Sequence, residues 1–265
     1  MMVKAILGRR VGAWAVVASI FGGADTNAQD VWRVQSVQVL HGSDFEEFDR
    51  SGVDKTTATY EYTGGGEYGF QYFYVDVYRY DEKGSKDVEF FGEYYRHFKV
   101  AGSRAKPGRR LSFKNLYLTA AGLAGARSND TEVVAGLFGA TADFNIPTFD
   151  YAALSMLTYV EATSINGRRG SCDGTTYQVT PFWRNSFQVR KLRFVTQGFA
   201  DFIGAKKGCA AQIIFQPQLA LDIGRLLGGK DDRLLLGVEH HVWDNKFGVR
   251  GLDESTTQAM IRFRF

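Results

Sequence analysis

The feature that most constrains this chain is the alternation of apolar and cationic residues at its C-terminus. Ile261, Phe263 and Phe265 alternate with Arg262 and Arg264. A period of two places successive side chains on opposite faces of a β-strand, so we expect a strand with one apolar and one cationic face. In a soluble barrel the apolar face would point inward. In a membrane barrel it points to lipid, and the arginines line a wet lumen.

Segments with strand character recur along the whole chain and are separated by turn residues. We predict twelve strands, at residues 32–40, 56–62, 68–78, 88–99, 115–123, 132–144, 151–165, 176–187, 192–203, 211–225, 234–243 and 257–265. An even number suits a single-chain barrel with both termini in the periplasm. The first, fourth and sixth segments alternate least regularly. The predicted fold class is all-β, as one antiparallel transmembrane β-barrel.

The N-terminal segment, residues 1–28, has the three parts of a secretory signal peptide. A basic start (residues 4–10) precedes an apolar stretch (residues 11–21) and a plausible cleavage site (residues 26–28). The apolar stretch is too short to cross a bilayer as a helix. We therefore predict an exported protein whose barrel occupies residues 29–265, with an N-terminal anchor or a buried helix as the alternative.

Composition excludes several classes of protein. The mean hydropathy of −0.22 argues against a helical membrane protein, while 14% aromatic residues and 30 glycines favour strands, tight turns and aromatic girdles. Removing the predicted leader takes a charge of +2 from the formal net charge of +3, so the mature chain carries +1. That charge gives no support to nucleic-acid binding. No cofactor is expected.

The chain has two cysteines, Cys172 and Cys209. Neither belongs to a CxxC motif or a Cys/His cluster, so no metal site is expected. If the first strand runs outward, both cysteines lie in neighbouring external connections. Because exported proteins meet an oxidising environment, we predict a disulfide between them, with two free thiols as the alternative.

Parity assigns the side chains of each predicted strand to the lumen or to lipid. The expected lumenal residues are Thr57, Thr59, Glu61, Tyr68, Phe70, Tyr72, Tyr74, Asp76, Tyr78, Gln212, Gln216, Gln218, Asp222, Glu239, His241, Trp243, Arg262 and Arg264. Aromatic rings can stack on a planar solute, and carboxylates and amides can accept hydrogen bonds from its hydroxyls. The alternative is that the tyrosines fill a narrow barrel or form the interface girdle.

Three N-terminal segments resemble the first four strands of the Tsx/OmpK family of nucleoside-specific channel-forming outer-membrane proteins. They are VQVLHGSDFEEF (residues 37–48), TTATYEYTGGGEYGFQYFYVDVYRYDE (residues 56–82) and FFGEYYRHF (residues 90–98). The later GFADF segment (residues 198–202) and the terminal strand fit the same order. The fourth strand lacks a proline that family members often carry, and the connection at residues 81–87 is shorter than in better-known members.

The resemblance implies a narrow, monomeric, twelve-stranded barrel that passes nucleosides by diffusion through weak sites. It places substrate-binding residues at Glu61, Phe70, Tyr72, Tyr74, Asp76 and Glu93, to which lumen parity adds Arg262. Bacterial outer-membrane barrels characteristically end on an aromatic residue that the barrel-assembly machinery reads, which assigns that role to Phe265. The remaining expected partners are outer-membrane lipid and lipopolysaccharide.

Two other functions remain open from the sequence. A lipid-modifying enzyme would need a nucleophile and a base near the lipid interface. Of the four histidines, His240 is expected to face lipid and His241 the lumen, but no serine is placed beside either, so the chain is not expected to be an enzyme. A non-conducting receptor or structural barrel is the other alternative. The basic connection at residues 100–113 is expected to be a solvated loop.

Overall fold

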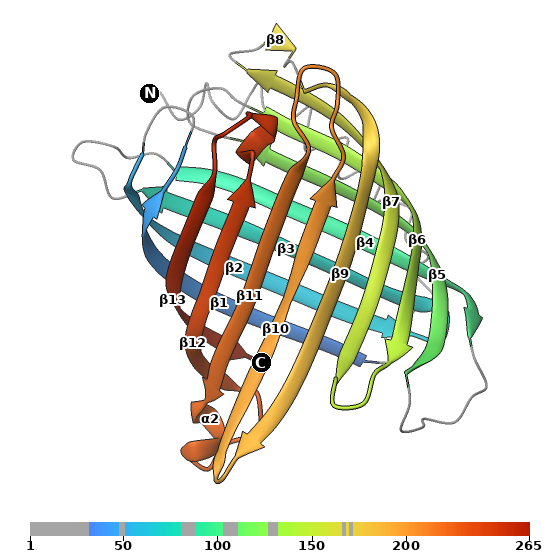
Figure 1. The fold of residues 1–265 in the computed structure, drawn as a ribbon. Helices are drawn as coiled ribbons and strands as arrows, with labels where there is room; N and C mark the ends of the chain where they lie inside the picture. The colour runs from blue at the N-terminus through green and yellow to red at the C-terminus, as the bar shows by residue number, and fades with distance from the viewer. Residues whose placement is uncertain are drawn as a thin grey trace, which may run out of the picture.

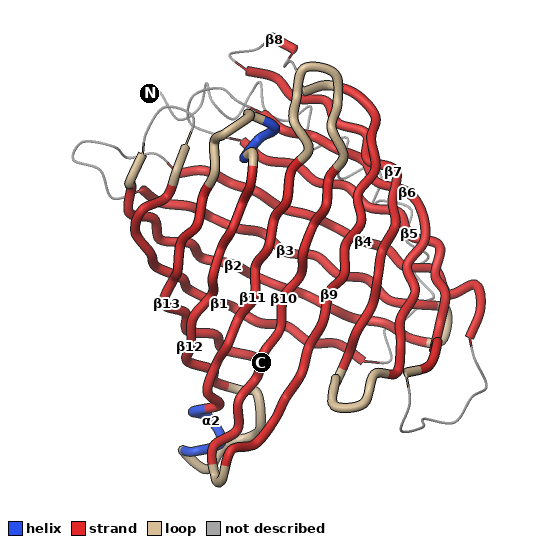
Figure 2. The backbone as a smooth tube through the Cα atoms, viewed as in Figure 1, coloured by secondary structure: helices blue, strands red, loops and turns tan. Residues whose placement is uncertain are grey.

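The computed structural model describes residues 32–47, 51–80, 88–102, 111–126, 132–165, 168–169 and 172–265. Figure 1 shows a single β-barrel, and the backbone tube in Figure 2 is almost entirely strand. Among the described residues, no helix is both long and apolar enough to cross a membrane. The long strands are β1 Trp32–Phe45, β2 Val53–Gly66, β3 Gly69–Tyr80, β4 Val88–Gly102, β5 Ser112–Ala126, β6 Glu132–Asn145, β7 Tyr151–Ile165, β9 Gly174–Val189, β10 Leu192–Ile203, β11 Gln212–Asp222, β12 Leu234–Asp244 and β13 Glu254–Arg264.

Every strand of the wall pairs antiparallel with its neighbours, and β13 returns to pair with β1, as in Val39 opposite Ile261. β8 (Arg168–Arg169) pairs only with the end of β7, so twelve strands form the closed wall. The predicted twelve-stranded antiparallel barrel is confirmed. A closed sheet leaves no edge with unpaired backbone groups, which is the condition for a sheet to exist in lipid.

Two predicted strand ends need correction. The segment expected to continue to residue 225 leaves the sheet at Asp222, whose side chain accepts a hydrogen bond from Arg225 N and caps the short helix α2 (Ile223–Leu226). The last strand ends at Arg264 rather than at Phe265. The backbone nitrogen of Phe265 still donates to Gln35 O at 3.1 Å, so the pairing with β1 continues to the last residue.

The antiparallel order gives the barrel two distinct ends. The start of β1 and the end of β13 lie at one end, which we call the terminal end, together with α2 and the tight β9–β10 turn. The opposite end carries the connections from β1 to β2, β7 to β9, β10 to β11 and β12 to β13. We call it the disulfide end, because the cysteines lie there.

Apolar side chains cover the outside of the wall, and polar ones fill much of the inside. On β13, Ile261 and Phe263 are 45% and 41% exposed, whereas Gln258 and Arg262 are 3% and 6% exposed. β1 repeats the pattern clearly, with Val37 and Val39 outward. An extended apolar outer surface around a polar interior is unfavourable in water and suits lipid. The fold is that of a transmembrane β-barrel.

Three buried apolar clusters are present in the described residues, and the two larger ones occupy part of the barrel interior. One comprises Leu40, Val195, Ala220, Leu235 and Met260, and the other comprises Leu123, Ala135, Leu137, Leu157 and Tyr159. They leave a cavity of about 1540 Å³ inside the barrel. Residues from both ends line this cavity, including Lys246 near the disulfide end and Arg264 at the terminal end. The interior is therefore a lumen into which the apolar clusters project from parts of the wall.

Candidate functional site: the lumen

All seven sequence-predicted binding residues line the cavity. They are Glu61, Phe70, Tyr72, Tyr74, Asp76, Glu93 and Arg262. Tyr68 was expected in the same row but is wrong as a lumenal residue. It lies in the turn between β2 and β3 and is 73% exposed, because β3 begins only at Gly69.

A row of tyrosines follows the inner face of β3, because every second residue of the strand points inward. The ring centroids of Tyr72 and Tyr74 lie 5.9 Å apart. Tyr72 is also 6.4 Å from Tyr95 on β4, and Tyr74 is 6.1 Å from Phe91 on the same strand. These tilted rings form a continuous aromatic patch on the lumen wall.

Glu61 and Arg262 form an ion pair that crosses the seam between β2, β1 and β13. Arg262 Nη2 lies 3.1 Å from Glu61 Oε2, and the same guanidinium donates to Gln38 Oε1 at 2.7 Å and 3.0 Å. Ser36 Oγ donates to Glu61 at 2.9 Å, and Tyr72 Oη donates to its other oxygen at 3.4 Å. Arg262 thus neutralises one lumenal carboxylate and is fixed in place by an amide.

The other two predicted carboxylates accept hydrogen bonds from neutral hydroxyls. Asp76 accepts from Thr59 at 2.5 Å and from Tyr78 at 2.8 Å. Glu93 accepts from Tyr95 at 2.7 Å. Among the described residues, neither carboxylate has a cation within ion-pair distance. Their charge is solvated by hydroxyls and is not cancelled.

Asp201 on β10 belongs to the same lumenal set and was missed. Gln178 Nε2 donates to it at 3.0 Å, and Thr180 Oγ1 also donates to it. Asp201 and Glu93 both line the cavity, and the charge of Asp201 acts on Glu93. Parity along β10 could have found it, because Gln197 and Phe199 precede Asp201 at every second position and line the cavity as well.

Glu239 on β12 was predicted to face the lumen but was not included in the site. It accepts from Gln218 Nε2 at 2.7 Å and from Gln258 Nε2 at 2.9 Å, one residue from each neighbouring strand. The carbonyl oxygens of both glutamines are buried and accept no hydrogen bond within the described part of the chain. This corner of the lumen wall therefore contains two buried acceptors that lack donors.

Phe70 has a mainly structural environment. Its ring stacks on His97 at 4.1 Å between centroids and meets Tyr117 edge-on at 5.2 Å. His97 is anchored by Thr119 Oγ1 at 2.9 Å from its Nδ1 atom. The Phe70 ring is thus occupied by contacts with two neighbouring rings of the wall. This environment supports the alternative that some aromatic residues fill the barrel, and it leaves Phe70 less suited to stacking on a solute.

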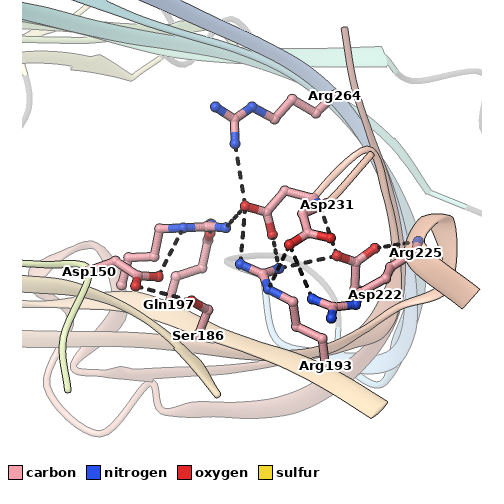
Figure 3. A network of polar contacts seen from close by, with 10 residues as sticks. Asp150, Ser186, Arg193, Gln197, Asp222, Arg225, Asp231 and Arg264 are labelled. Atoms are coloured by element: carbon pink, nitrogen blue, oxygen red, sulfur yellow. Dashed lines mark hydrogen bonds and ion pairs between the residues drawn. The ribbon is translucent and has the colours of Figure 1, made fainter. Parts of the chain in front are cut away.

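An ionic network occupies the terminal end of the lumen (Figure 3). Asp232, in the connection between α2 and β12, lies 2.9 Å from Arg184 and 3.5 Å from Arg264, and Arg193 also donates to it. Arg193 further pairs with the fully buried Asp222 at 3.1 Å. Burial alone would raise the pKa of Asp232, but the Arg193 hydrogen bond and the neighbouring guanidinium charges outweigh it and lower that pKa. The network fixes the connection to the inner wall.

Two further features brace the disulfide end. Lys246 is buried, and its Nζ atom lies 2.5 Å from Glu254 and 3.2 Å from Glu47. Cys172 and Cys209 form the predicted disulfide, which joins the β7–β9 and β10–β11 connections. These contacts link segments that are far apart in the sequence, and the alternation of apolar and polar residues does not predict them.

His240, the lipid-facing histidine considered for an enzymatic alternative, and Ser186, a serine that could act as a nucleophile, have different partners. Ser186 Oγ donates to Asp150 at 3.0 Å at the terminal end, whereas His240 Nδ1 contacts Thr257 at 2.9 Å. Within the described ranges there is no group of three or more His, Cys, Asp or Glu residues suited to a metal ion. The predicted leader lies outside the described residues, as do most of the basic connection and the short connection after β3.

Comparison with known proteins gives no family. No family model matches the chain, and no curated protein matches it. The resemblance to the Tsx/OmpK family therefore stays a prediction.

Several solved structures align over most of the chain. The translocator domain of the autotransporter NalP from Neisseria meningitidis covers 95% of this chain and 94% of its own length, at 13% identity and a TM-score of 0.40. OmpF from Salmonella typhi covers 89% and 100%, at 9% identity and a TM-score of 0.38. OpdQ from Pseudomonas aeruginosa covers 88% and 97%, at 8% identity and a TM-score of 0.35.

Proposed function

We propose that this chain is an outer-membrane channel that passes small solutes passively, and that nucleosides are among them. The observation that carries the proposal is the cavity inside the closed barrel, which is lined by residues of both ends and by the polar face of the wall. A structural barrel could fill its interior completely with side chains. This barrel keeps about 1540 Å³ of space beside its two larger apolar clusters.

The aromatic patch on β3 and β4 supports an aromatic solute. Tyr72, Tyr74 and Tyr95 line the cavity, and their rings lie 5.9 Å to 6.4 Å apart. A nucleoside base could stack on these rings, and Glu61 or Asp76 could accept hydrogen bonds from its sugar. Such sites must be weak, because a channel has to release what it binds. Arg262 then serves to position Glu61.

A liposome-swelling assay tests this function. We expect adenosine and thymidine to enter proteoliposomes faster than a sugar of equal size, because the sugar cannot stack on the tyrosines. Replacing Tyr72 and Tyr74 together with leucine keeps apolar bulk and removes the aromatic faces, so the advantage of the nucleosides should shrink. Equal rates for all three solutes through the unmodified barrel would contradict nucleoside selectivity.

A further inference from the structure

The lumen holds carboxylates that form no ion pair with any side chain in the described part of the chain. Four belong to this set, which we call the acidic belt: Asp76, Glu93, Asp201 and Glu239. They come from β3, β4, β10 and β12, so the belt involves opposite parts of the wall. The charge of Asp201 acts on Glu93, and the charge of Asp76 acts on both Glu93 and Glu239. Glu93 is thus subject to the charges of two other members of the belt.

The nearby cations make their closest contacts with other groups, and the charges of Lys55 and Arg262 act on Asp76 and Glu239 from a distance. Arg262 is paired with Glu61 and Gln38. Lys55 Nζ lies over the ring of Phe45 at 3.6 Å. In the described ranges, none of the four belt carboxylates has an ion-pair partner, and their hydrogen-bond donors are neutral hydroxyls and amides. Carboxylates brought together without cations repel one another, and a bound cation relieves that repulsion.

A second and independent observation points to the same kind of ligand. Gln218 and Gln258 both give their amide hydrogens to Glu239, which leaves their carbonyl oxygens without a donor. Both side chains are more than nine-tenths buried and line the cavity. A buried acceptor without a partner is unfavourable, so this corner favours a ligand that brings hydrogen-bond donors.

Aromatic faces complete the site. The rings of Tyr72, Tyr74 and Tyr95 line the cavity beside Glu93, which accepts the Tyr95 hydroxyl. The face of a tyrosine ring attracts a cation, most strongly where water is excluded. Carboxylates, free carbonyl oxygens and ring faces all favour a positively charged donor.

We infer that the acidic belt makes the lumen selective for cations and binds solutes that carry an ammonium group on an aromatic body. This inference rests on the proposed channel function and narrows its substrate class. Three hydrogens on one nitrogen match an acceptor-rich lining, while the aromatic body lies on the tyrosines. Neutral aromatic solutes would use the tyrosines alone and bind more weakly.

The first test is the reversal potential of the purified barrel in a planar bilayer under a KCl gradient. We expect K⁺ to be roughly ten times more permeant than Cl⁻ at low ionic strength. This ratio is the lower end of the range by which a cleft lined with one sign of charge concentrates its counter-ions. The double variant E93Q/D201N should bring the ratio toward one. The control D54N/E67Q removes the same two charges from exposed positions that do not line the cavity, so its ratio should stay near that of the unmodified barrel.

The second test separates charge from shape. Benzylammonium should reduce the K⁺ current, and benzyl alcohol at equal concentration should not, because the two differ mainly in the ammonium group. The E93Q/D201N variant should weaken the block several-fold. A barrel that conducts with equal K⁺ and Cl⁻ permeability, or that both compounds block alike, overturns the inference and leaves the channel intact. A barrel that does not conduct overturns the proposed function, and the inference with it.

Discussion

At the scale of single residues, Asp232 is notable because three guanidinium groups contact its carboxylate. Arg184, Arg193 and Arg264 reach it from β9, β10 and β13, and its own backbone nitrogen donates to Asp222 at 2.8 Å. This one carboxylate thus ties the α2–β12 connection to three strands of the wall. Asp232 thus differs from the carboxylates of the acidic belt, which form no ion pairs within the described residues.

Replacing Asp232 with asparagine should therefore destabilise the barrel. Three guanidinium groups lose their shared charged partner. A hydrogen bond to a charged group contributes about 1.5–3 kcal/mol to the free energy of unfolding. We expect a decrease of about 2 kcal/mol in the free energy of unfolding, measured by urea titration of the folded barrel in lipid vesicles. The control is D231N. The exposed Asp231 carboxylate contacts Arg225 at 3.2 Å and Arg193 at 3.8 Å, and its loss should cost less than about 1 kcal/mol because both contacts are open to solvent on the Asp231 side.

The same contact predicts how this difference depends on pH. Because the pKa of Asp232 is lower in the folded barrel, its contribution is fully present above the unfolded value of about 4 and is lost as the pH falls through the folded value. The gap in stability between the unmodified barrel and D232N should stay constant from neutral pH down to about 5 and close below about 4. A gap that widens in acid would contradict the assigned ion pairs.

At the scale of elements, the strands are well predicted and the connections are not. Alternation is a local property of each segment, so the sequence already reveals β13, β3 and β10. Parity then places Glu61 and Asp76 in the lumen without any knowledge of the loops, and the family resemblance adds Glu93, which lines the cavity as well. Contacts between connections have no such signal, apart from the disulfide, which followed from two cysteines in neighbouring predicted connections. Lys246 meets Glu47 across 199 positions of sequence, and nothing periodic links them.

The disulfide end supplies a prediction about one connection. Gly248 has a φ of +75° and lies against both cysteines, so an added Cβ atom would approach Cys209 Cβ to 2.7 Å and Cys172 Sγ to 3.2 Å. We expect G248A to lower the free energy of unfolding by about 1–3 kcal/mol more than a matched control, through overpacking. G251A is that control, because Gly251 has a φ of +78° with no atom within 4 Å of the added carbon. Equal losses in the two variants would mean that the close approach to the disulfide is unimportant.

At the scale of the whole molecule, the inverted distribution of polar and apolar residues links fold and function. Apolar side chains such as Phe263 face outward while Arg262 is buried beside the lumen, which resolves the ambiguity left by the C-terminal alternation. The family resemblance placed candidate residues on three strands, and parity added Arg262 on a fourth. Neither could show that Arg262 forms an ion pair with Glu61, because that contact depends on how β1, β2 and β13 meet at the closure of the barrel.

The central claim is that this lumen is a route across the membrane, and electrical recording of the purified barrel in a planar lipid bilayer tests it most directly. We predict discrete steps of current as single barrels insert, with each step stable at moderate voltage. The cavity lined from both ends and the polar inner wall require this result. Insertion of correctly folded barrels, verified by heat-modifiable migration in gels, without any current steps would contradict the account and favour a closed structural or receptor barrel.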